Sequence, residues 1–474
     1  MTSYIVSAFS KIGMMAAVVA ASLFPTSLSA QDVAGAADAA ELALAGETPV
    51  LDSGNTAWLI VATVLVLLMS IPGIALFYGG LVRQKNVLSV IMQTMFIVGV
   101  VSILWVAFGY SWAFGTGFME SGNPLGAVIG GFDKAFLYGI TIDTMMPSGI
   151  PELTFVMFQC MFALITPALI LGAFAERIKF SGYTVFIVLW VILAYFPMAH
   201  WVWGGGFLQR MGAIDFAGGT VVHINAGISA LVMAIMLGKR EDYRIGHPVI
   251  PHNVAFVFMG TSFLWLGWFG FNAGSGLAAD GLAANAFLVT HVATAVAAVT
   301  WMAMDWICNK KPTTVGACTG AVAGLVAITP AAGTVDLLGA FCIGLITPVV
   351  CFFMVAVIKP KFKYDDALDA FGVHGMGGIV GSVLTGIFAT RYITGEDGVQ
   401  GALYGDWHQL WVQIFTTLVS IVFSAVVTYV LYKAVDKLIG IRVDKRVEEE
   451  GLDIYEHGET AYNYRRGTGR TFSS

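Results

Sequence analysis

Two histidines lie inside long apolar segments of this sequence, where ionisable side chains are uncommon. His223 sits in the glycine-rich run 218–227, and His374 sits in the run 371–378. Ionisable groups in such segments usually face a protein interior or a cavity. A neutral imidazole offers one hydrogen-bond donor and one acceptor, so two facing imidazoles could line a narrow polar path and share a proton. The alternative is a pair of packed, hydrogen-bonded histidines.

Acidic residues precede both histidines. Asp215 lies eight residues before His223, or about 12 Å of helix, and Asp369 lies five residues before His374, or about 7.5 Å. Because the two segments are expected to enter the membrane from opposite sides, both histidines can reach the interior of the helix bundle. A third histidine, His291, has no such symmetry, and we expect it to be a packing residue.

Aromatic residues form a second group of interest. Phe158 and Phe162 are four residues apart, and Trp268 and Phe271 are three apart, so each pair shares one helix face. Trp203 stands directly before three glycines. Aromatic faces attract cations, more strongly when desolvated. In membrane proteins most aromatic side chains pack in the core or at the membrane interface. The pattern therefore permits a cation site without establishing one.

The composition excludes a soluble globular protein. Apolar residues make up 57% of the chain and charged residues 11%, and the mean hydropathy is +0.80. Soluble domains carry about 25% charged residues. The net charge of −6 gives no indication of a nucleic-acid partner. The five cysteines lie in or beside apolar runs with no paired spacing, so we expect no disulfide framework, metal site or cofactor.

The N-terminal residues are typical of a secretory signal. Lys11 precedes an apolar run at 13–24 and small residues up to Ala30, which predicts a signal peptide over 1–30. This run is too short to span a bilayer comfortably, although a retained anchor is the alternative. Residues 31–52 are Ala-rich and acidic, and we expect an extracytoplasmic lead-in there.

Apolar segments long enough to cross a bilayer recur along the rest of the chain. A spanning helix needs about 20 such residues. Eleven segments qualify, and they predict an all-α polytopic membrane protein with a membrane domain over 53–436 and a cytoplasmic tail over 437–474. The expected spans are 56–78, 88–114, 153–175, 183–199, 218–237, 254–271, 284–306, 315–329, 337–358, 370–390 and 410–434.

The distribution of basic residues tests this number of spans. With the mature N-terminus outside, 20 of the 24 Lys and Arg residues fall in inner loops and the tail. Only Lys134, Arg210 and Arg391 fall outside, and Lys11 belongs to the signal. This bias satisfies the positive-inside rule. One missed or invented span would reverse every later loop, so we predict an odd number of spans and a cytoplasmic C-terminus.

Ten of the spans could form two five-helix halves of opposite orientation, followed by a last helix. Inverted repeats of this kind place the functional site at their interface, near the bilayer midplane. His223 lies in the fifth span and His374 in the tenth, so the two histidines occupy equivalent positions.

Four motifs resemble signatures of the Amt/Mep/Rh ammonium transporter family, and of its bacterial Amt branch most closely. The resemblance extends from about Asp52 to Tyr462, nearly the whole mature chain, and its motifs are long and in order. They are residues 71–80 (IPGIALFYGG), 215–225 (DFAGGTVVHIN), 268–275 (WFGFNAGS) and 371–375 (FGVHG).

The resemblance implies a homotrimer in the inner (plasma) membrane whose subunits each carry a pore for ammonium, with methylammonium as a further substrate, and no enzymatic activity. By motif position, an outer ammonium recruitment site and a phenylalanine gate precede the two histidines. The implied recruitment residues are Trp203, Phe162 and Ser275. The implied gate and pore residues are Phe162, Phe271, Trp268, His223 and His374. Asp215 is implied to support the outer site electrostatically, and Phe158 to lie beside the pore.

The tail also resembles bacterial members of this family. Residues 448–459 (EEEGLDIYEHGE) are similar to their ordered cytoplasmic tail, which implies docking of a PII-type nitrogen-signalling protein. A solvated charged tail is the alternative. The basic extension over 465–474 departs from the short tails expected of the family.

Several functions stay open at this point. The histidines could ligate haem in a membrane redox protein, although glycine-packed helices argue against so wide a cavity. An ammonium sensor (transceptor) and an Rh-like channel for neutral gas are nearer alternatives. The absence of an output domain after the last span disfavours a self-contained sensor, and Trp203 and Ser275 favour a cation-recruiting transporter. The sequence leaves open whether the proton accompanies ammonia.

Overall fold

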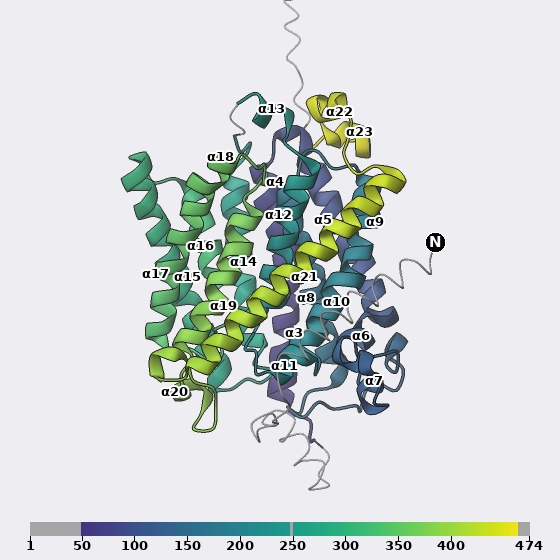
Figure 1. The fold of residues 1–474 in the computed structure, drawn as a ribbon, viewed down its shortest axis with the longest axis vertical. Coiled ribbons are helices and arrows are strands. Elements are labelled where there is room, and N and C mark those ends of the chain that lie inside the picture. Colours follow the sequence, from purple (N-terminus) through teal and green to yellow (C-terminus); the bar gives the residue numbers. More distant parts are fainter. Residues whose placement is uncertain (1–48, 247–249, 463–474) are drawn as a thin grey trace, which may run out of the picture.

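The computed structural model describes residues 49–246 and 250–462, which are almost entirely helical (Figure 1). Within these ranges the only β-type pairings are two isolated bridges, Met145 with Pro151 and Ile178 with Arg442. The expected signal peptide, most of the expected lead-in and the basic extension lie outside the described residues.

The first half of the chain contains five apolar helical segments, several of them divided by short π-helical turns. In chain order the elements are α3 (Ser53–Leu68), η1 (Met69–Ile74), α4 (Ala75–Leu81), η2 (Gln84–Asn86), α5 (Val87–Leu104), η3 (Trp105–Gly109), α6 (Tyr110–Phe114), α7 (Gly117–Glu120), η4 (Pro124–Ala127), η5 (Ala135–Leu137), α8 (Glu152–Phe174), α9 (Phe180–Trp190), η6 (Val191–Tyr195), α10 (Phe196–Trp203), α11 (Phe207–Arg210), η7 (Gly219–Ile224), α12 (Asn225–Leu237) and α13 (Glu241–Arg244).

The second half has fewer π-helical turns and ends with a long helix and two short tail helices. Its elements are α14 (Val254–Gly274), α15 (Gly281–Asn309), α16 (Thr314–Ile328), α17 (Leu337–Phe353), η8 (Met354–Ile358), α18 (Lys359–Phe362), η9 (Phe371–Gly375), α19 (Met376–Phe388), α20 (Arg391–Thr394), η10 (Ala402–Tyr404), α21 (Trp407–Ile439), α22 (Lys445–Glu450) and α23 (Leu452–His457).

Ten helical segments of the described chain are long and apolar enough to cross a membrane. An eleventh apolar helix, α16, has 15 residues and a length of about 22 Å. Each of the eleven expected spans coincides with one of these helices. The expected and observed helices differ mainly at their ends. Polar residues can form the last turn of a helix, and a prediction from hydropathy alone ends the helix before them. The expected span 410–434 is thus α21, which runs from Trp407 to Ile439.

Side chains of residues just outside several spans define where the helices begin. Asp52, Asn253, Asp280 and Asp336 each accept a hydrogen bond from a backbone N–H in the first turn of the helix that follows. These N–H groups have no partner within the helix, so the side-chain oxygens stabilise the helix start. Two further aspartates cap in the same way the helix starts that carry the histidines described below.

Two antiparallel segments, η7–α12 and η9–α19, cross at their glycines. A Cβ atom on Gly227 would lie 2.2 Å from the Cα of Gly375, and one on Gly378 would lie 2.9 Å from the carbonyl oxygen of Gly219. Each of these glycines lies four residues after a histidine, and each packs against the partner segment near the other histidine. Small residues permit this close approach of two membrane helices.

Helix α21 runs obliquely across one face of the bundle (Figure 1). Buried polar side chains join it to α12. The Ser424 hydroxyl donates to Asn225 Oδ1 at 2.8 Å, and the Thr428 hydroxyl donates to Ser229 Oγ at 2.7 Å. In an apolar setting such bonds hold two helices in one register, because neither group has water as a partner.

The short helices α13, α18, α22 and α23 gather at one end of the bundle, and α7, α11 and α20 lie at the opposite end (Figure 1). The tail contacts the membrane domain directly. Asp453 accepts hydrogen bonds from the backbone N–H groups of Leu88 and Ser89 at 3.0 and 2.8 Å. Glu456 accepts one from Phe180 N–H at 2.9 Å. The tail therefore caps the first turns of α5 and α9.

Buried ion pairs occupy the same end. Arg240 pairs with Glu176 at 2.9 Å and with Asp365 at 2.8 Å, and Arg83 also pairs with Glu176. Burial alone would raise the pKa of Glu176, but Arg240 and Arg83 hold it at about 2. Burial likewise opposes ionisation of Asp365, and Arg240 lowers its pKa to about 2. Both carboxylates are therefore ionised, and the pair of Arg240 with Asp365 joins the two halves of the chain.

Candidate functional site

The two predicted histidines meet at the centre of the bundle. The ring centroids of His223 and His374 are 5.4 Å apart, with planes inclined by 15°. Both side chains are buried, and both nitrogens of His223 and Nδ1 of His374 have no hydrogen-bond partner within the described residues. Buried polar atoms are normally satisfied, so unpartnered nitrogens indicate a position where a small polar solute can bind.

Aromatic rings continue the line of imidazoles toward one end of the bundle. Phe162 of α8 and Phe271 of α14 are stacked, with centroids 4.3 Å apart and an interplanar angle of 28°. Trp203 stands perpendicular to Phe162 at 5.8 Å. Phe271 lies 6.2 Å from His223. The predicted residues thus form a continuous series from Trp203 through the two phenylalanines to the histidines.

Hydrogen bonds fix the polar groups of this series. Trp268 stacks on His223 at 5.3 Å, and its indole N–H donates to Thr329 Oγ1 at 2.8 Å. The indole N–H of Trp203 donates to the carbonyl oxygen of Asp215 at 2.7 Å. The Ser275 hydroxyl donates to the Phe271 carbonyl at 2.8 Å, which leaves the Ser275 oxygen free to accept another hydrogen bond.

Asp215 positions His223 from outside the helix. Its carboxylate accepts hydrogen bonds from four consecutive backbone N–H groups, at 3.0, 2.5, 2.8 and 3.0 Å, at the start of η7. Each carboxylate oxygen of Asp215 accepts two of these hydrogen bonds, so neither oxygen is left to bind a solute directly. The expected 12 Å separation along a helix is wrong, because Asp215 lies in the preceding loop and folds back onto the helix start.

The counterpart of Asp215 in the second half is Asp366, which the sequence reasoning missed. Asp366 accepts from the N–H groups of Ala370 and Phe371 at 3.1 and 2.8 Å, at the start of η9. It lies eight residues before His374, the same offset as Asp215 before its histidine. That repeated offset was the available signal. Asp369 instead pairs with Lys359 at 2.6 Å.

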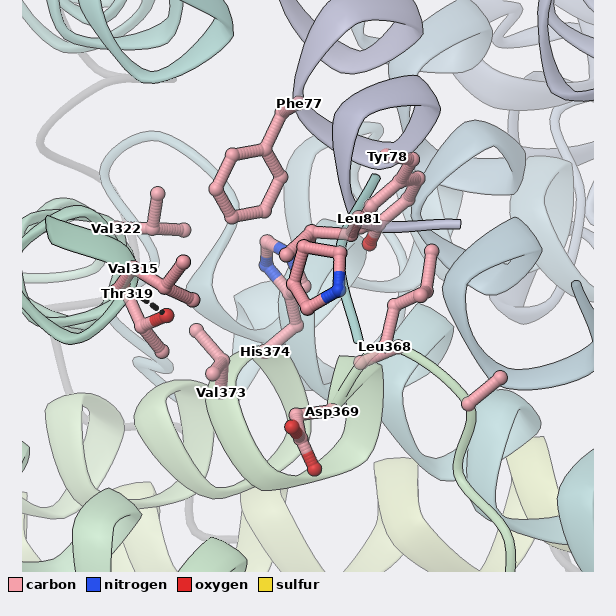
Figure 2. Close-up of a pocket in the computed structure, with 13 residues that line it drawn as sticks. Phe77, Tyr78, Leu81, Val315, Thr319, Val322, Leu368, Asp369, Val373 and His374 are labelled. Atoms are coloured by element: carbon pink, nitrogen blue, oxygen red, sulfur yellow. Dashed lines mark hydrogen bonds between the residues drawn. The ribbon is translucent and has the colours of Figure 1, made fainter. Parts of the chain in front are cut away.

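A cavity of about 150 Å³ opens on the far side of His374 (Figure 2). Phe77, Tyr78 and Val322 form apolar and aromatic walls, and Asp369 lies at its rim. The Tyr78 hydroxyl donates to a backbone carbonyl, that of Leu169, at 3.1 Å. The histidine pair therefore lies between the stacked phenylalanines and this cavity.

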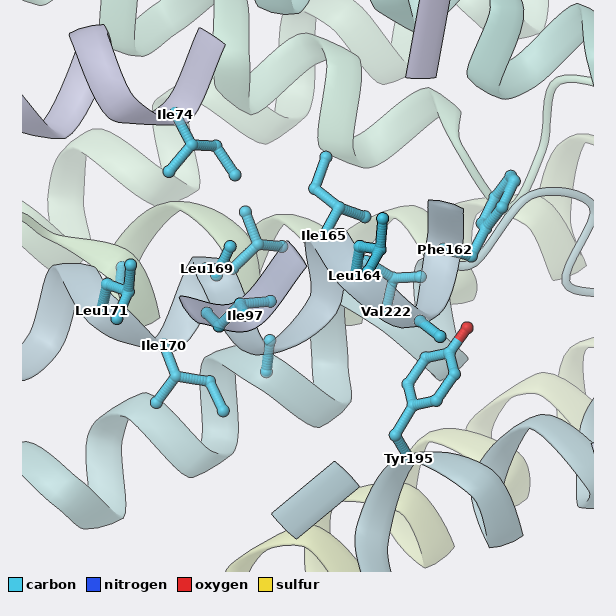
Figure 3. Packing of buried hydrophobic residues seen from close by; sticks show 14 of the residues in the cluster. Ile74, Ile97, Phe162, Leu164, Ile165, Leu169, Ile170, Leu171, Tyr195 and Val222 are labelled. Atoms are coloured by element: carbon cyan, nitrogen blue, oxygen red, sulfur yellow. The ribbon is translucent and has the colours of Figure 1, made fainter. Parts of the chain in front are cut away.

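Aliphatic side chains surround the phenylalanine end of the series. Figure 3 shows Leu164 and Ile165 of α8 and Val222 of η7 near Phe162. All four are at most 2% exposed, so they are shielded from bulk solvent. Such surroundings strongly disfavour a bare charge and tolerate a small neutral solute.

Two further sequence expectations concern residues beside the site. Phe158 packs edge-on against Phe162 at 5.0 Å, as expected for a residue next to the series. His291 lies on the exposed face of α15 against Trp265 and Phe269, away from the series. Among the described residues no cluster of His, Cys, Asp or Glu could hold a metal ion. The two imidazole rings are nearly parallel, with planes inclined by 15°.

The fold and the site define a multi-pass helical membrane protein with a buried series of aromatic and histidine side chains contributed by both halves of the chain. The sequence model of the Ammonium Transporter Family matches residues 57–462. The chain belongs to this family, which confirms the resemblance noted in the sequence, and its general function is ammonium transport.

Similar proteins support this assignment along most of the chain. The ammonium transporter of Aquifex aeolicus (strain VF5) is 50% identical over 416 residues, which cover 87% of this chain and 94% of the relative. That of Bacillus subtilis (strain 168) is 48% identical over 413 residues, covering 87% and 99%.

Solved structures share the fold. Saccharomyces cerevisiae Mep2 has a TM-score of 0.76 and 35% identity, and the match covers 83% of this chain and 88% of Mep2. A structure described as a sensor Amt protein has a TM-score of 0.77 and 31% identity, covering 85% and 98%.

Proposed function

We propose that the chain recruits the ammonium ion at an outer aromatic site, deprotonates it near a phenylalanine gate and passes ammonia, with or without the proton, along its two histidines into the cytoplasm. The observation that carries this proposal is the unbroken series from Trp203 to His374, which ends on buried imidazole nitrogens without a hydrogen-bond partner among the described residues. Ammonia is a small solute that can both donate to and accept from such nitrogens.

Recruitment takes place at Trp203, Phe162 and Ser275. Each aromatic face favours a cation by about 0.5–2 kcal/mol. The Ser275 oxygen supplies an acceptor, because its hydroxyl proton already points at the Phe271 carbonyl. Asp215 adds negative charge nearby without contacting the ion, since its carboxylate is bonded to the start of η7.

Deprotonation occurs at the stacked pair of Phe162 and Phe271. A bare ammonium ion in an apolar medium costs tens of kcal/mol by an idealised Born estimate, whereas neutral ammonia avoids most of this cost. Beyond the gate, ammonia exchanges hydrogen bonds with His223 and His374 and enters the cavity below His374. Water in the outer vestibule accepts the proton released at the gate. Transfer of this proton through the histidines to the cytoplasm makes the net process electrogenic ammonium uptake driven by the membrane potential, whereas its loss to the outside makes the process neutral ammonia conduction.

Reconstituted protein on a solid-supported membrane tests this function directly. Ammonium and methylammonium pulses should produce transient currents, and potassium pulses should not. Replacing His223 and His374 together with leucine should abolish the selective ammonium current, because apolar side chains offer ammonia no hydrogen bond. The single variant His291→Leu, on the exposed face of α15, is the matched control and should transport normally. A potassium-excluding current that persists in the double variant refutes the role of the pair.

We further propose eleven membrane spans, an outer N-terminus and a cytoplasmic C-terminus, with 53–436 as the membrane domain and 437–474 as the regulatory tail. Helix α16 supplies the eleventh span despite its 15 residues, since it packs among α14, α15 and α17 rather than against lipid alone. The positive-inside bias places the end with α22 and α23 in the cytoplasm. Accessibility of single cysteines introduced into α20 and α22 to a membrane-impermeant reagent tests this orientation.

The protein acts as a homotrimer in the inner (plasma) membrane, and a PII-type nitrogen-signalling protein docks on its cytoplasmic face. The short helix α13, the loop at Lys310 and the tail present charged groups at that end. A pull-down across nucleotide and ligand conditions tests the docking, and a negative result at every condition counts against it. Mass measurement of the detergent-solubilised protein tests the trimer.

A sensing function is the second candidate, because the sensor Amt protein matches this chain along 98% of its own length. A neutral gas channel is the third. Transient ammonium currents of the reconstituted protein, at rates typical of transporters, would favour a transporter over a sensor. Ammonia entry without charge movement, followed with a pH-sensitive dye in vesicles, favours the gas channel.

A further inference from the structure

A shallow groove separates α12 from α21 on the outside of the bundle. Its volume is about 360 Å³, and apolar side chains line it almost completely. They are Val232, Ile235 and Met236 of α12 and Ala425, Val426 and Tyr429 of α21. Ile235 is 57% exposed and Tyr429 is 49% exposed, so the groove faces outward and not into the bundle.

The floor of the groove is rigid. On α21, Ser424, Thr428 and Tyr432 occur at four-residue intervals, and each bonds to α12. The last of these bonds, from the Tyr432 hydroxyl to the Met236 carbonyl, is 3.0 Å long. The polar bonds therefore hold the two helices at a constant separation. The apolar side chains of the groove lie on the neighbouring, outward face of each helix, where the acyl chain of a lipid would contact them.

Basic groups mark the end of the groove nearest α22. The Lys433 ammonium lies 6.0 Å from the ring centroid of Tyr429, which lines the groove. Lys437 follows four residues later on the same exposed face, and Lys239 follows the end of α12. Asp436 is the acidic residue of α21 in this region. On α21, Lys433 and Lys437 against Asp436 leave a positive charge at this end of the groove.

The carbonyl end of α12 does not oppose this charge. Helix C-termini carry partial negative charge. Here Arg442 donates to the carbonyl oxygens of Leu237 and Lys239 at 2.6 and 2.7 Å, and Arg177 donates to that of Gly238 at 2.9 Å. The exposed carbonyls are therefore neutralised, and an anionic group can approach the lysines.

We propose that this groove binds an anionic phospholipid, with one acyl chain along the apolar rim and the phosphate at Lys433 and Lys437. An acyl chain matches a narrow apolar slot that faces the bilayer, and the phosphate matches lysines at its charged end. The lipid would contact the helix that begins beside His223, and the proposal stands independently of the transport mechanism.

Native mass spectrometry of the full chain in detergent tests the proposal. Phosphatidylglycerol and phosphatidylcholine with identical acyl chains are titrated separately. The protein should bind phosphatidylglycerol more tightly. A lysine near a membrane surface contributes about fivefold to anionic lipid binding, so Lys433→Gln with Lys437→Gln should weaken phosphatidylglycerol about thirtyfold and leave phosphatidylcholine unchanged. The control pair Lys310→Gln with Lys311→Gln, exposed at the same end of the bundle, should bind like the unaltered protein.

A second variant tests the apolar slot. Val426→Trp fills the groove from its exposed rim and should weaken both lipids. Equal binding of the two lipids, or equal behaviour of the two lysine pairs, overturns the proposal. Full competition by glycerol phosphate, which lacks acyl chains, would show a free-anion site instead. A changed number of chains per particle in Val426→Trp would show that the groove is an interface between copies, and either result overturns the lipid assignment.

Discussion

The crossing of η7–α12 with η9–α19 makes a sharp prediction at Gly227. A methyl group there would lie 2.2 Å from both the Cα and the backbone nitrogen of Gly375. Ordinary contact begins at about 3.4 Å, so one segment must move by about 1.2 Å. Backbone atoms cannot turn aside as a flexible side chain can. Gly227→Ala must therefore displace His374, which adjoins Gly375, from His223.

The expected effect on transport is large because the imidazoles work at hydrogen-bond range. A misplacement of 1 Å can cost about 100-fold where groups must be aligned. Overpacking of this kind costs typically about 1–3 kcal/mol of stability, so the protein should still fold. We expect the ammonium current of Gly227→Ala to fall by 10- to 100-fold on a solid-supported membrane, with a lowered but cooperative thermal unfolding transition.

Gly99→Ala is the matched control, because Gly99 lies in α5 and a Cβ atom there would meet nothing within 4 Å. This variant should transport normally and unfold at the same temperature or slightly higher, since alanine favours a helix over glycine. If Gly227→Ala conducts ammonium as well as Gly99→Ala does, the separation of the histidines does not control transport, and the reasoning is refuted.

Three further predictions follow from the aspartate cap, the buried ion pairs and the tail. Asp366→Ala removes the acceptor of three N–H groups at the start of η9 and should cost about 0.5–2 kcal/mol of stability and much of the current. Asp366→Asn keeps an acceptor and should retain more of both. Burial opposes ionisation of Glu176, but Arg240 holds its pKa at about 2, below the usual 4.5. The ionised carboxylate should therefore stabilise the fold fully above pH 4.5, and this stabilisation should be lost as the pH falls toward 2. Thermal unfolding temperatures measured across this range should fall with pH, and Glu176→Gln should make them depend less on pH. Asp453→Ala removes the cap on α5 and should speed hydrogen exchange in α22 and α23, while Glu459→Ala, at an exposed residue, should not; equal exchange in both would show that the cap does not hold the tail.

Some features of the fold were readable from local composition. Each expected span coincides with an apolar helix, because a chain in lipid must satisfy its backbone within one continuous helix. Trp203, which directly precedes three glycines in the sequence, is the last residue of α10. Span ends were less accurate, since capping residues and polar last turns extend helices beyond the apolar run.

Other features depended on how helices turn and cross. Hydropathy reports how apolar a segment is but not which face meets a neighbour, so it could not show that Trp268 stacks on His223 or that His291 faces outward. Spacing along the chain drew attention to Asp369, the acidic residue nearest to His374, although the loop geometry makes Asp366 the cap.

The sequence by itself determined the membrane class, the helical segments, the family and the identity of the paired histidines. Those properties follow from composition and from the order of residues along one chain. Only the tertiary structure decided the spacing of the imidazoles, the stack of Phe162 on Phe271 and the contact of the tail with α5 and α9. These depend on close contacts between glycines and on backbone N–H groups at helix starts, where residues distant in the chain meet in space.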